Sequence, residues 1–473
     1  MLSAVIRQQW MILARDNRFR LLFTALLLAS IAALAGGVSR NERWVTERTA
    51  AAQADAHAWN AQGETNPHHA AHFGHYVFKT VTPLSVLDPG LLDDLGNLLR
   101  LEAHKQSPAS ARPSDAGTAL TRFGGFSAAS CLQQLAPLLM ILLGFTAFSG
   151  ERARALLGQE IAAGIDPRVL MLGRLLALGA VIGGLLLIVF SAAGALVLAS
   201  GTASDEFGKL VLMLAGYGLY LSIFLAVALG VSATMRSARS ALTILLGFWV
   251  IAVLLVPAIG PTIAAKVYPT PSGAQLYADA ESEIADQLNG DGPPAQRGDR
   301  ITASILEKYG VTSVEDLPVS LNGAVLEFTE DGSTAVYRRH FSALDVVYAR
   351  QARLIRMFAL LSPLTVLRPW SAGLAGTDLA AHQLFLREAE EYRYTFVQMM
   401  NRDIANNASK ATGGKYKANV AHLTSNLTPF RSSVPTMPEI WNQRWLDGTL
   451  LVIWFGLAVW FACWAAGRLQ NAP

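Results

Sequence analysis

Six long apolar runs constrain the fold of this 473-residue chain more than any other feature. Each run has the length that an α-helix needs to cross the hydrocarbon core of a bilayer. They cover residues 21–38, 131–149, 169–199, 210–234, 241–264 and 446–466. We therefore expect a mainly α membrane protein with six transmembrane helices.

Composition supports this class of protein. Asp, Glu, Lys and Arg make up 15% of the residues, whereas a soluble protein carries about a quarter. The deficit comes from the apolar runs, since the segments between them have ordinary soluble composition. A net charge of +3, without a stripe of Lys and Arg between aromatic residues, argues against a nucleic-acid partner. Cys131 and Cys463 both lie in apolar runs at opposite expected membrane faces, so we expect no disulfide between them.

Residues 1–20 form a basic amphipathic segment that is expected to lie flat at the membrane interface, with Trp10 at headgroup level. An alternative is a cleaved secretory signal, because Ala33-Leu34-Ala35 fits a signal-peptidase site. The long basic leader and the later spans favour an uncleaved first span at residues 21–38.

Two long polar regions, residues 39–129 and 265–445, are expected to form one mostly helical ectodomain. Breaks are expected at residues 289–294, 331–333 and 413–414, which are rich in Gly, Asn, Asp and Pro. The expected helices cover residues 44–61, 91–104, 273–288, 300–309, 335–361 and 379–408.

Arginine and lysine in the short segments predict the orientation. The leader, the connector at residues 150–168 and the turn at residues 236–239 are rich in arginine, whereas the opposing short turn offers Lys209. By the positive-inside rule, the arginine-rich segments are cytoplasmic. Both termini are then cytoplasmic, and the ectodomain lies in the periplasm of a bacterium whose inner membrane holds the chain.

The connector between the second and third runs reads as a short amphipathic helix, residues 150–163, that ends before Pro167. Leu156, Leu157 and Ile161 share one side of it. Glu151, Arg152, Arg154 and Glu160 lie largely elsewhere.

No energy source is evident within the chain. Apart from Asp447 at the start of the last run, the apolar runs contain no Asp, Glu, Lys or His that would hold a transported cation. Residues 413–416, Gly-Gly-Lys-Tyr, lack the hydroxyl residue and the preceding strand of a phosphate-binding loop, and no catalytic motif appears. We therefore expect no enzyme activity and no cofactor in this chain, with ATP and Mg²⁺ held by a partner subunit.

The leading interfacial helix, six spans, glutamate-led connector and tryptophan-rich last span resemble the type-2 ABC exporter permeases. In that family the connector is a coupling helix that fits a groove in the ABC ATPase, with the pattern Gly-Glu-Arg-Glu-x-Gly-Thr-Leu. Gly150, Glu151, Arg152 and Leu156 match it, while residues 153–155 depart from it. The coupling residues that the resemblance implies are Glu151, Arg152, Arg154, Leu156 and Leu157.

Residues 83–90, 101–104, 361–363 and 375–378 resemble the subgroup with large extracytoplasmic insertions and unassigned substrate. This resemblance implies two permease subunits, identical or homologous, together with two ATPase subunits. It does not name a substrate.

Four histidines crowd residues 67–76, and on a helix His68, His72 and His75 would share one face within reach of a metal ion. The alternative is a partly exposed polar helix whose histidines only titrate, because no cysteine or close carboxylate completes the set. We expect Glu102 and His104 to lie on a helix and to face away from each other. They are therefore interpreted as structural residues and not as an acid–base pair.

In the second region, Glu388, Glu390, Glu391 and Arg393 are expected to form a solvated charged helix face. Residues 375–378, Ala-Gly-Thr-Asp, predict a helix stop followed by a capping Thr377 or Asp378.

These features favour the permease subunit of an ATP-driven exporter. In a first alternative, the chain works with an ATPase but transports no cargo. The ectodomain then acts mechanically on a periplasmic protein, for example in metal-site maturation or ligand release. A second alternative is a membrane-anchored sensor or metal-binding scaffold.

Overall fold

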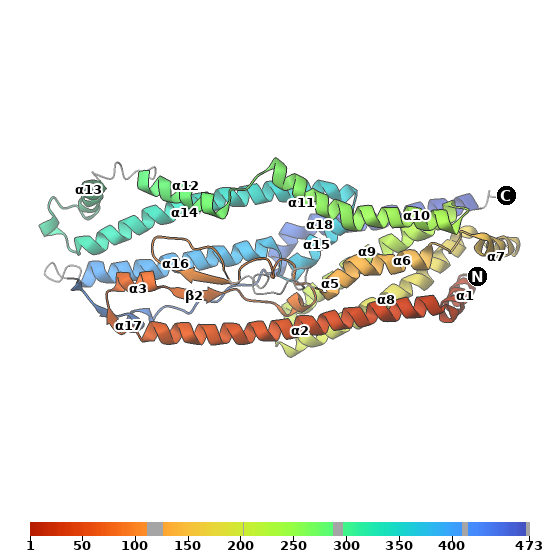
Figure 1. Cartoon of the computed structure of the whole chain (residues 1–473), viewed down its shortest axis with the longest axis horizontal. Coiled ribbons are helices and arrows are strands. Elements are labelled where there is room, and N and C mark those ends of the chain that lie inside the picture. Colours follow the sequence, from red (N-terminus) through yellow and green to blue (C-terminus); the bar gives the residue numbers. More distant parts are fainter. Residues whose placement is uncertain (111–125, 202, 287–296, 409–414, 470–473) are drawn as a thin grey trace.

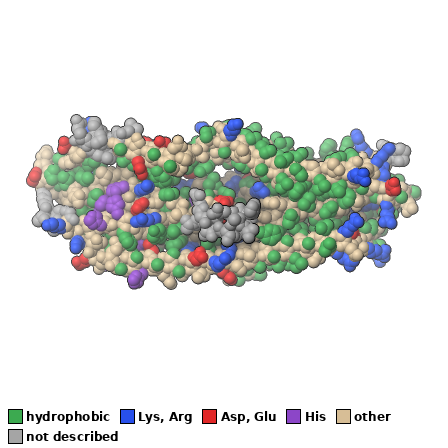
Figure 2. Space-filling view, viewed as in Figure 1, with side chains coloured by type: hydrophobic (Ala, Val, Ile, Leu, Met, Phe, Trp, Pro, Cys, Tyr) green, Lys and Arg blue, Asp and Glu red, His purple; other side chains and the backbone are tan. Residues whose placement is uncertain are grey.

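The computed structural model describes residues 1–110, 126–201, 203–286, 297–408 and 415–469. It is an elongated, mainly helical molecule with an apolar bundle toward one end and a polar, helix-rich part at the other (Figure 1). Hydrophobic side chains cover the surface of the bundle, and Lys and Arg gather beyond it at the nearer tip (Figure 2). This distribution is that of a multi-pass membrane protein.

Five helical segments among the described residues are long and apolar enough to cross a membrane. They are α2 (Asn17–Asn60), α8 (Pro167–Ala199), α9 (Ala203–Thr234), the continuous segment of α10 (Ala238–Trp249), η3 (Val250–Leu255) and α11 (Val256–Val267), and α18 (Met437–Leu469). The remaining predicted run, residues 131–149, is a shorter apolar helix, Ala128–Gly144, built from α5 (Ala128–Ser130), η2 (Cys131–Leu135) and α6 (Ala136–Gly144).

Helix α9 lies at the centre of the bundle and packs against α6, α8 and α18. Three of its aromatic side chains, Tyr217, Tyr220 and Phe224, are fully buried. Small residues bring the neighbouring backbones close, because a Cβ added at Gly144 would lie 2.7 Å from the Cβ of Ala228. Such close packing of small residues is the usual basis of helix association in membranes.

Helix α2 continues from the bundle far into the polar part (Figure 1). The expected break between a span ending at residue 38 and a helix starting at residue 44 is therefore wrong. Asp16 separates α2 from α1 (Leu2–Arg15) and caps α2, because its carboxylate accepts from the Arg18 N–H at 2.9 Å. No Pro or helix stop interrupts residues 17–60, so the polar half simply extends the span.

The first polar region contains α3 (Pro67–Phe73), η1 (Pro83–Val86) and three strands, one of which pairs with a strand of the second polar region. Strand β2 (His75–Phe78) pairs with β3 (Leu98–Leu101), and β1 (Glu64–Thr65) pairs with β4 (Ala418–Asn419). The helix expected at residues 91–104 is thus wrong. Leu99 and Leu101 are buried on either side of exposed Arg100, which is the alternation of a strand.

The second polar region consists mainly of helices and returns to the bundle through α15 (Leu364–Leu374), which packs on α9 and α18. The break expected at residues 331–333 is wrong, because α14 (Leu321–Met357) runs through it and Ser333 Oγ donates to the Thr329 carbonyl at 3.0 Å. The breaks expected at 289–294 and 413–414 lie outside the described residues. The other elements are α12 (Gly273–Asp286), α13 (Arg297–Tyr309), η5 (Val314–Asp316), η6 (Phe358–Leu360), α16 (Leu379–Asn407) and α17 (Val420–Thr424).

Residues 375–378 end α15 and start α16. Gly376 has a φ of 65°, which glycine adopts without strain. Asp378 is the N-cap of α16, because its Oδ1 accepts from the Ala381 N–H at 2.9 Å.

The solvated charged face expected on α16 is wrong for two of its four residues. Arg393 is 1% exposed, and its guanidinium contacts Glu390 at 2.8 Å, Glu330 of α14, and the Thr334 hydroxyl at 2.8 Å. Glu390 is also buried, whereas Glu391 is exposed. The charges are buried because α14 packs along this face of α16 and supplies Glu330 as a partner.

Candidate functional site

The connector forms a separate short helix, α7 (Glu151–Ala162), at the arginine-rich tip of the bundle. Helix α1, the end of α18 and α7 lie together there (Figure 1). Gly150 precedes α7 with a φ of 91°, and its N–H donates to the Arg236 carbonyl at 3.0 Å. The turn between α9 and α10 therefore lies directly against the start of α7.

A buried ion pair ties α7 to the bundle. Glu160 Oε2 lies 2.8 Å from Arg174 Nη2 of α8, with 7% and 4% of the side chains exposed. The Arg174 guanidinium also lies 4.2 Å from the ring centroid of Phe148 and donates to the Ala147 carbonyl. Glu160 was not expected to have this role, because the pairing spans the turn around Pro167 and needs the tertiary fold.

The turn between α6 and α7 is held by Ser232 of α9. Its fully buried Oγ accepts from the N–H groups of Phe148 and Ser149, at 2.9 and 3.1 Å, and donates to the Phe145 carbonyl at 2.8 Å. These bonds satisfy backbone N–H and carbonyl groups in the turn after α6, where no regular helix continues. Together with the Glu160–Arg174 pair, these bonds tie both ends of α7 to the bundle.

The five predicted coupling residues differ in how far they are exposed. Glu151 and Arg152 are exposed at the start of α7, and Leu156 is half-buried. Leu157 is buried against the bundle. Arg154 is half-buried, and its Nη2 donates to the Met235 carbonyl at 3.4 Å. Glu151 and Arg152 therefore face outward, while Leu157 anchors the helix to the bundle.

A second polar cluster lies at the other end of the bundle, where η1 meets α8 and α9. Tyr217 links Gln133 and Ser371, with its hydroxyl oxygen 2.9 Å from Gln133 Nε2 and 3.1 Å from Ser371 Oγ. Ser371 in turn donates to the Asp88 carboxylate, which also accepts from the Gly90 N–H at 3.0 Å. Asp88 was expected only in a turn, because the sequence does not show that residues 83–90 pack onto the spans.

The predicted histidine group is rearranged. Helix α3 ends at Phe73, so His75 lies on β2, where its Nδ1 lies 2.8 Å from Asp55 Oδ2. His75 therefore does not share a face with His68 and His72. His104 takes its place, since one ring nitrogen of each of His68, His72 and His104 lies within 4.8 Å of the others.

Burial and the neighbouring imidazoles of His104 and His72 lower the pKa of His68 to about 4. Burial would raise the pKa of Glu330, which contacts His104, but hydrogen bonds with His104 and Arg393 and the Arg393 charge hold it at about 2. Near pH 7 this group therefore combines a neutral His68 with an ionised Glu330.

An apolar helical bundle with an anchored amphipathic helix at its arginine-rich tip is the architecture of a multi-pass membrane protein. Residues 7–313 match the model of the ABC-2 family transporter proteins, and the chain belongs to this family. It is thus an ABC-2 type permease, a transport subunit that is not itself catalytic. Residues 277–431 match a domain of unknown function, DUF3526. A comparison with curated proteins finds no match.

Proposed function

We propose that this chain is the permease subunit of an ATP-driven exporter and that a separate ABC ATPase drives it through α7. The observation that carries the proposal is the two-sided character of this helix. Glu151 and Arg152 face outward, while Leu157 and the Glu160–Arg174 pair fix the opposite side to the bundle. A partner that binds the exposed side would therefore move the ends of α6 and α8.

The arginines at the same tip support an orientation of the chain in the membrane. Arginines of α1, α7 and the turn after α9 gather there, and Figure 2 shows the resulting group of Lys and Arg beyond the apolar surface. By the positive-inside rule this tip lies in the cytoplasm, where ATP is available. The polar part then lies in the periplasm of a bacterial cell whose inner membrane holds the chain.

The assembly contains two permease subunits, identical or homologous, and two ATPase subunits that hold ATP and Mg²⁺. Closure of the ATPases would tilt α7 and displace the helix ends to which it is tied. In this mechanism Glu151, Arg152 and Leu156 contact the ATPase, Arg154 orients the start of α7 on Met235, and Leu157 transmits the motion.

Site-directed cross-linking tests the contact. Arg152→Cys, in a background with exposed Cys463 replaced by alanine, is co-expressed with candidate ATPases encoded near this gene. We expect a cross-link from Arg152→Cys and none from Glu64→Cys, an exposed position in the polar part. A cross-link from residue 64 alone would place the ATPase at the wrong end.

The double variant Glu151→Ala/Arg152→Ala tests the coupling. Both side chains are exposed, so we expect normal folding with loss of permease-dependent ATP hydrolysis in the reconstituted complex. The control is Glu64→Ala, at an exposed position in the polar part, which should leave permease-dependent hydrolysis unchanged. Full permease-dependent hydrolysis in the double variant would contradict the proposal.

The uninterrupted helix α2 favours a second candidate function, in which the polar part acts mechanically on a periplasmic protein without transporting cargo. One rigid helix of 44 residues joins the cytoplasmic side of the bundle to the polar part. Such work includes maturation of a metal site or release of a bound ligand. Partners recovered with the polar part would then change with ATP, whereas an exporter requires no such partner.

A further inference from the structure

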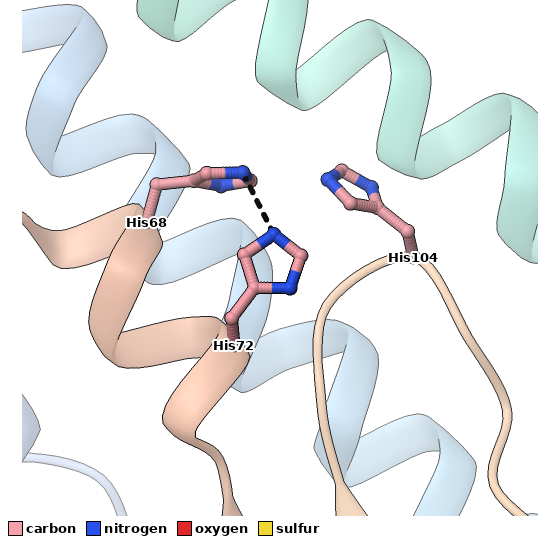
Figure 3. A group of neighbouring side chains, drawn as sticks. All are labelled: His68, His72 and His104. Atoms are coloured by element: carbon pink, nitrogen blue, oxygen red, sulfur yellow. Dashed lines mark hydrogen bonds between the residues drawn. The ribbon is translucent and has the colours of Figure 1, made fainter. Parts of the chain in front are cut away.

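Three imidazole rings converge on one point outside the membrane-spanning segments. His68 and His72 project from α3, and His104 projects from the loop after β3 (Figure 3). The Nε2 atoms of His68 and His72 lie 3.1 Å apart. His72 is exposed and His68 and His104 are half-buried, so the group is accessible to solvent, and Figure 2 shows histidine side chains at the surface of the polar part.

The far ring nitrogens of two of these histidines are held by polar side chains. His68 Nδ1 lies 3.3 Å from Oδ1 of the buried Asn401, and His104 Nδ1 lies 3.0 Å from Oε2 of the buried Glu330. Both acceptors face Nδ1, so we assign the ring protons to Nδ1, which leaves Nε2 with its lone pair. Metal-binding histidines are oriented by this kind of bond to a carboxylate or carbonyl oxygen.

The backbone at His104 is strained. His104 has a φ of 63°, and among the described residues it is the single non-glycine residue with a positive φ. Its N–H donates to Glu330 Oε2 at 2.8 Å, so one carboxylate holds both the backbone and the ring. Strain of this kind persists where the surroundings enforce it, and it clusters at ligand sites.

We propose that His68, His72 and His104 bind a divalent transition metal ion of the Zn²⁺ class, with a fourth position open to solvent. Tetrahedral zinc with nitrogen ligands places those nitrogens about 3.3 Å apart. His68 and His72 already have this spacing. His104 has to approach by no more than about 1.5 Å from the 4.8 Å limit of the present group.

A bound ion would also affect how the two polar regions pack against each other. His68, His72 and His104 belong to the first polar region, whereas Glu330 and Asn401 belong to α14 and α16 of the second. A bound ion would tighten the contact between the two regions and raise the thermal stability of the polar part. Binding of the ion requires neither the ATPase nor transport.

The test uses the full-length chain, without a polyhistidine tag, purified in detergent and stripped with a chelator. Co²⁺ is titrated first, because tetrahedral Co²⁺ has intense visible absorption, and Zn²⁺ is then added in competition. We expect one ion per chain, with displacement of Co²⁺ by Zn²⁺ and a rise in the apparent Tm.

Three variants assign the site. His72→Gln changes an exposed side chain, and His104→Asn keeps a residue type that tolerates a positive φ, so both are expected to fold. Each should weaken binding by more than about 100-fold, beyond the effect of losing an outer-shell partner. His69→Gln, on an exposed position of the same helix, should leave binding unchanged.

Failure of the folded wild-type chain to bind one ion would overturn the proposal. So would binding that survives both His72→Gln and His104→Asn, or that His69→Gln weakens equally. Loss of coupling to the ATPase has no bearing on any of these outcomes.

Discussion

Glu160 Oε2 and Arg174 Nη2 lie 2.8 Å apart at the junction of α7 and α8, and both side chains are almost fully buried. A buried charge that loses its partner destabilises a protein strongly, because its desolvation is no longer offset. This pair therefore controls both the position of α7 and the stability of the adjoining helix ends.

We expect Glu160→Gln to lower the stability of the protein by about 3–5 kcal/mol, because it leaves the Arg174 charge buried without a counter-charge. The measurement is the apparent Tm in detergent. The adjacent exposed residue provides the control, and Gln159→Ala should change the Tm little. Equal Tm values for the two variants would show that the pair does not hold α7.

Two neighbouring glycines of α2 allow a matched comparison. A Cβ added at Gly37 would lie 2.5 Å from the Val86 carbonyl oxygen of η1, whereas a Cβ at Gly36 meets nothing within 4 Å. We expect Gly37→Ala to destabilise the protein by about 1–3 kcal/mol through overpacking. Gly36→Ala should be neutral or stabilising by up to about 1 kcal/mol. Thermal unfolding that ranks them in the opposite order would refute the packing of η1 on α2.

Arg393 makes a third test. Arg393→Met leaves the buried carboxylates of Glu330 and Glu390 without their cation, and we expect a loss of about 3–5 kcal/mol. Arg402→Met, on the same helix with 64% of its side chain exposed, should cost less than about 0.5 kcal/mol. Chemical denaturation followed by tryptophan fluorescence measures both. A small effect of Arg393→Met would mean that this face of α16 is solvated after all.

Lys79 predicts a dependence on pH. Its side chain is buried, and among the described residues its Nζ has no hydrogen-bond partner. Burial lowers the pKa of Lys79 from 10.5 to about 8, although the Asp378 charge acts in the opposite direction. Below about pH 8 the folded and unfolded chains are both protonated, and the folded chain carries the full desolvation cost. Between about pH 8 and 10.5 the unfolded chain binds more protons, so this group makes stability rise with pH.

Lys79→Met removes that cost. We expect the variant to be more stable than the wild type near pH 7, on the order of 3 kcal/mol, from a shift of about 2.5 pKa units. The difference in apparent Tm should shrink as the pH approaches 10. A difference that stays constant over this range would mean that Lys79 is not the group responsible.

The apolar helices were predictable because transmembrane length and hydropathy are local properties of the sequence. The N-cap at Asp378 was predictable for the same reason, since capping depends on neighbouring residues. The strand at Leu98–Leu101 was missed because its short alternation resembles a helix segment until its partner β2 is known.

The candidate sites were only partly predictable, because their partners are distant in sequence. Glu160 resembles any exposed connector glutamate until Arg174 folds back onto it. Arg393 resembles a solvated residue until α14 supplies Glu330, 63 residues away. His104 joins His68 and His72 through a loop whose left-handed backbone has no local sequence signal, whereas His75 has the right spacing but lies beyond the end of α3.

The packing of the first polar region against the second has a consequence for biogenesis. The indole of Trp59 donates to the Thr424 hydroxyl, and these partners lie 365 residues apart in the chain. At ribosomal speeds of about 5–20 residues per second, the first polar region waits roughly 20 to 70 seconds for its complement to be synthesised. During that interval Trp59 and the apolar side chains packed with it lack their partners from α16 and α17, so the first polar region is open to misfolding until the second emerges.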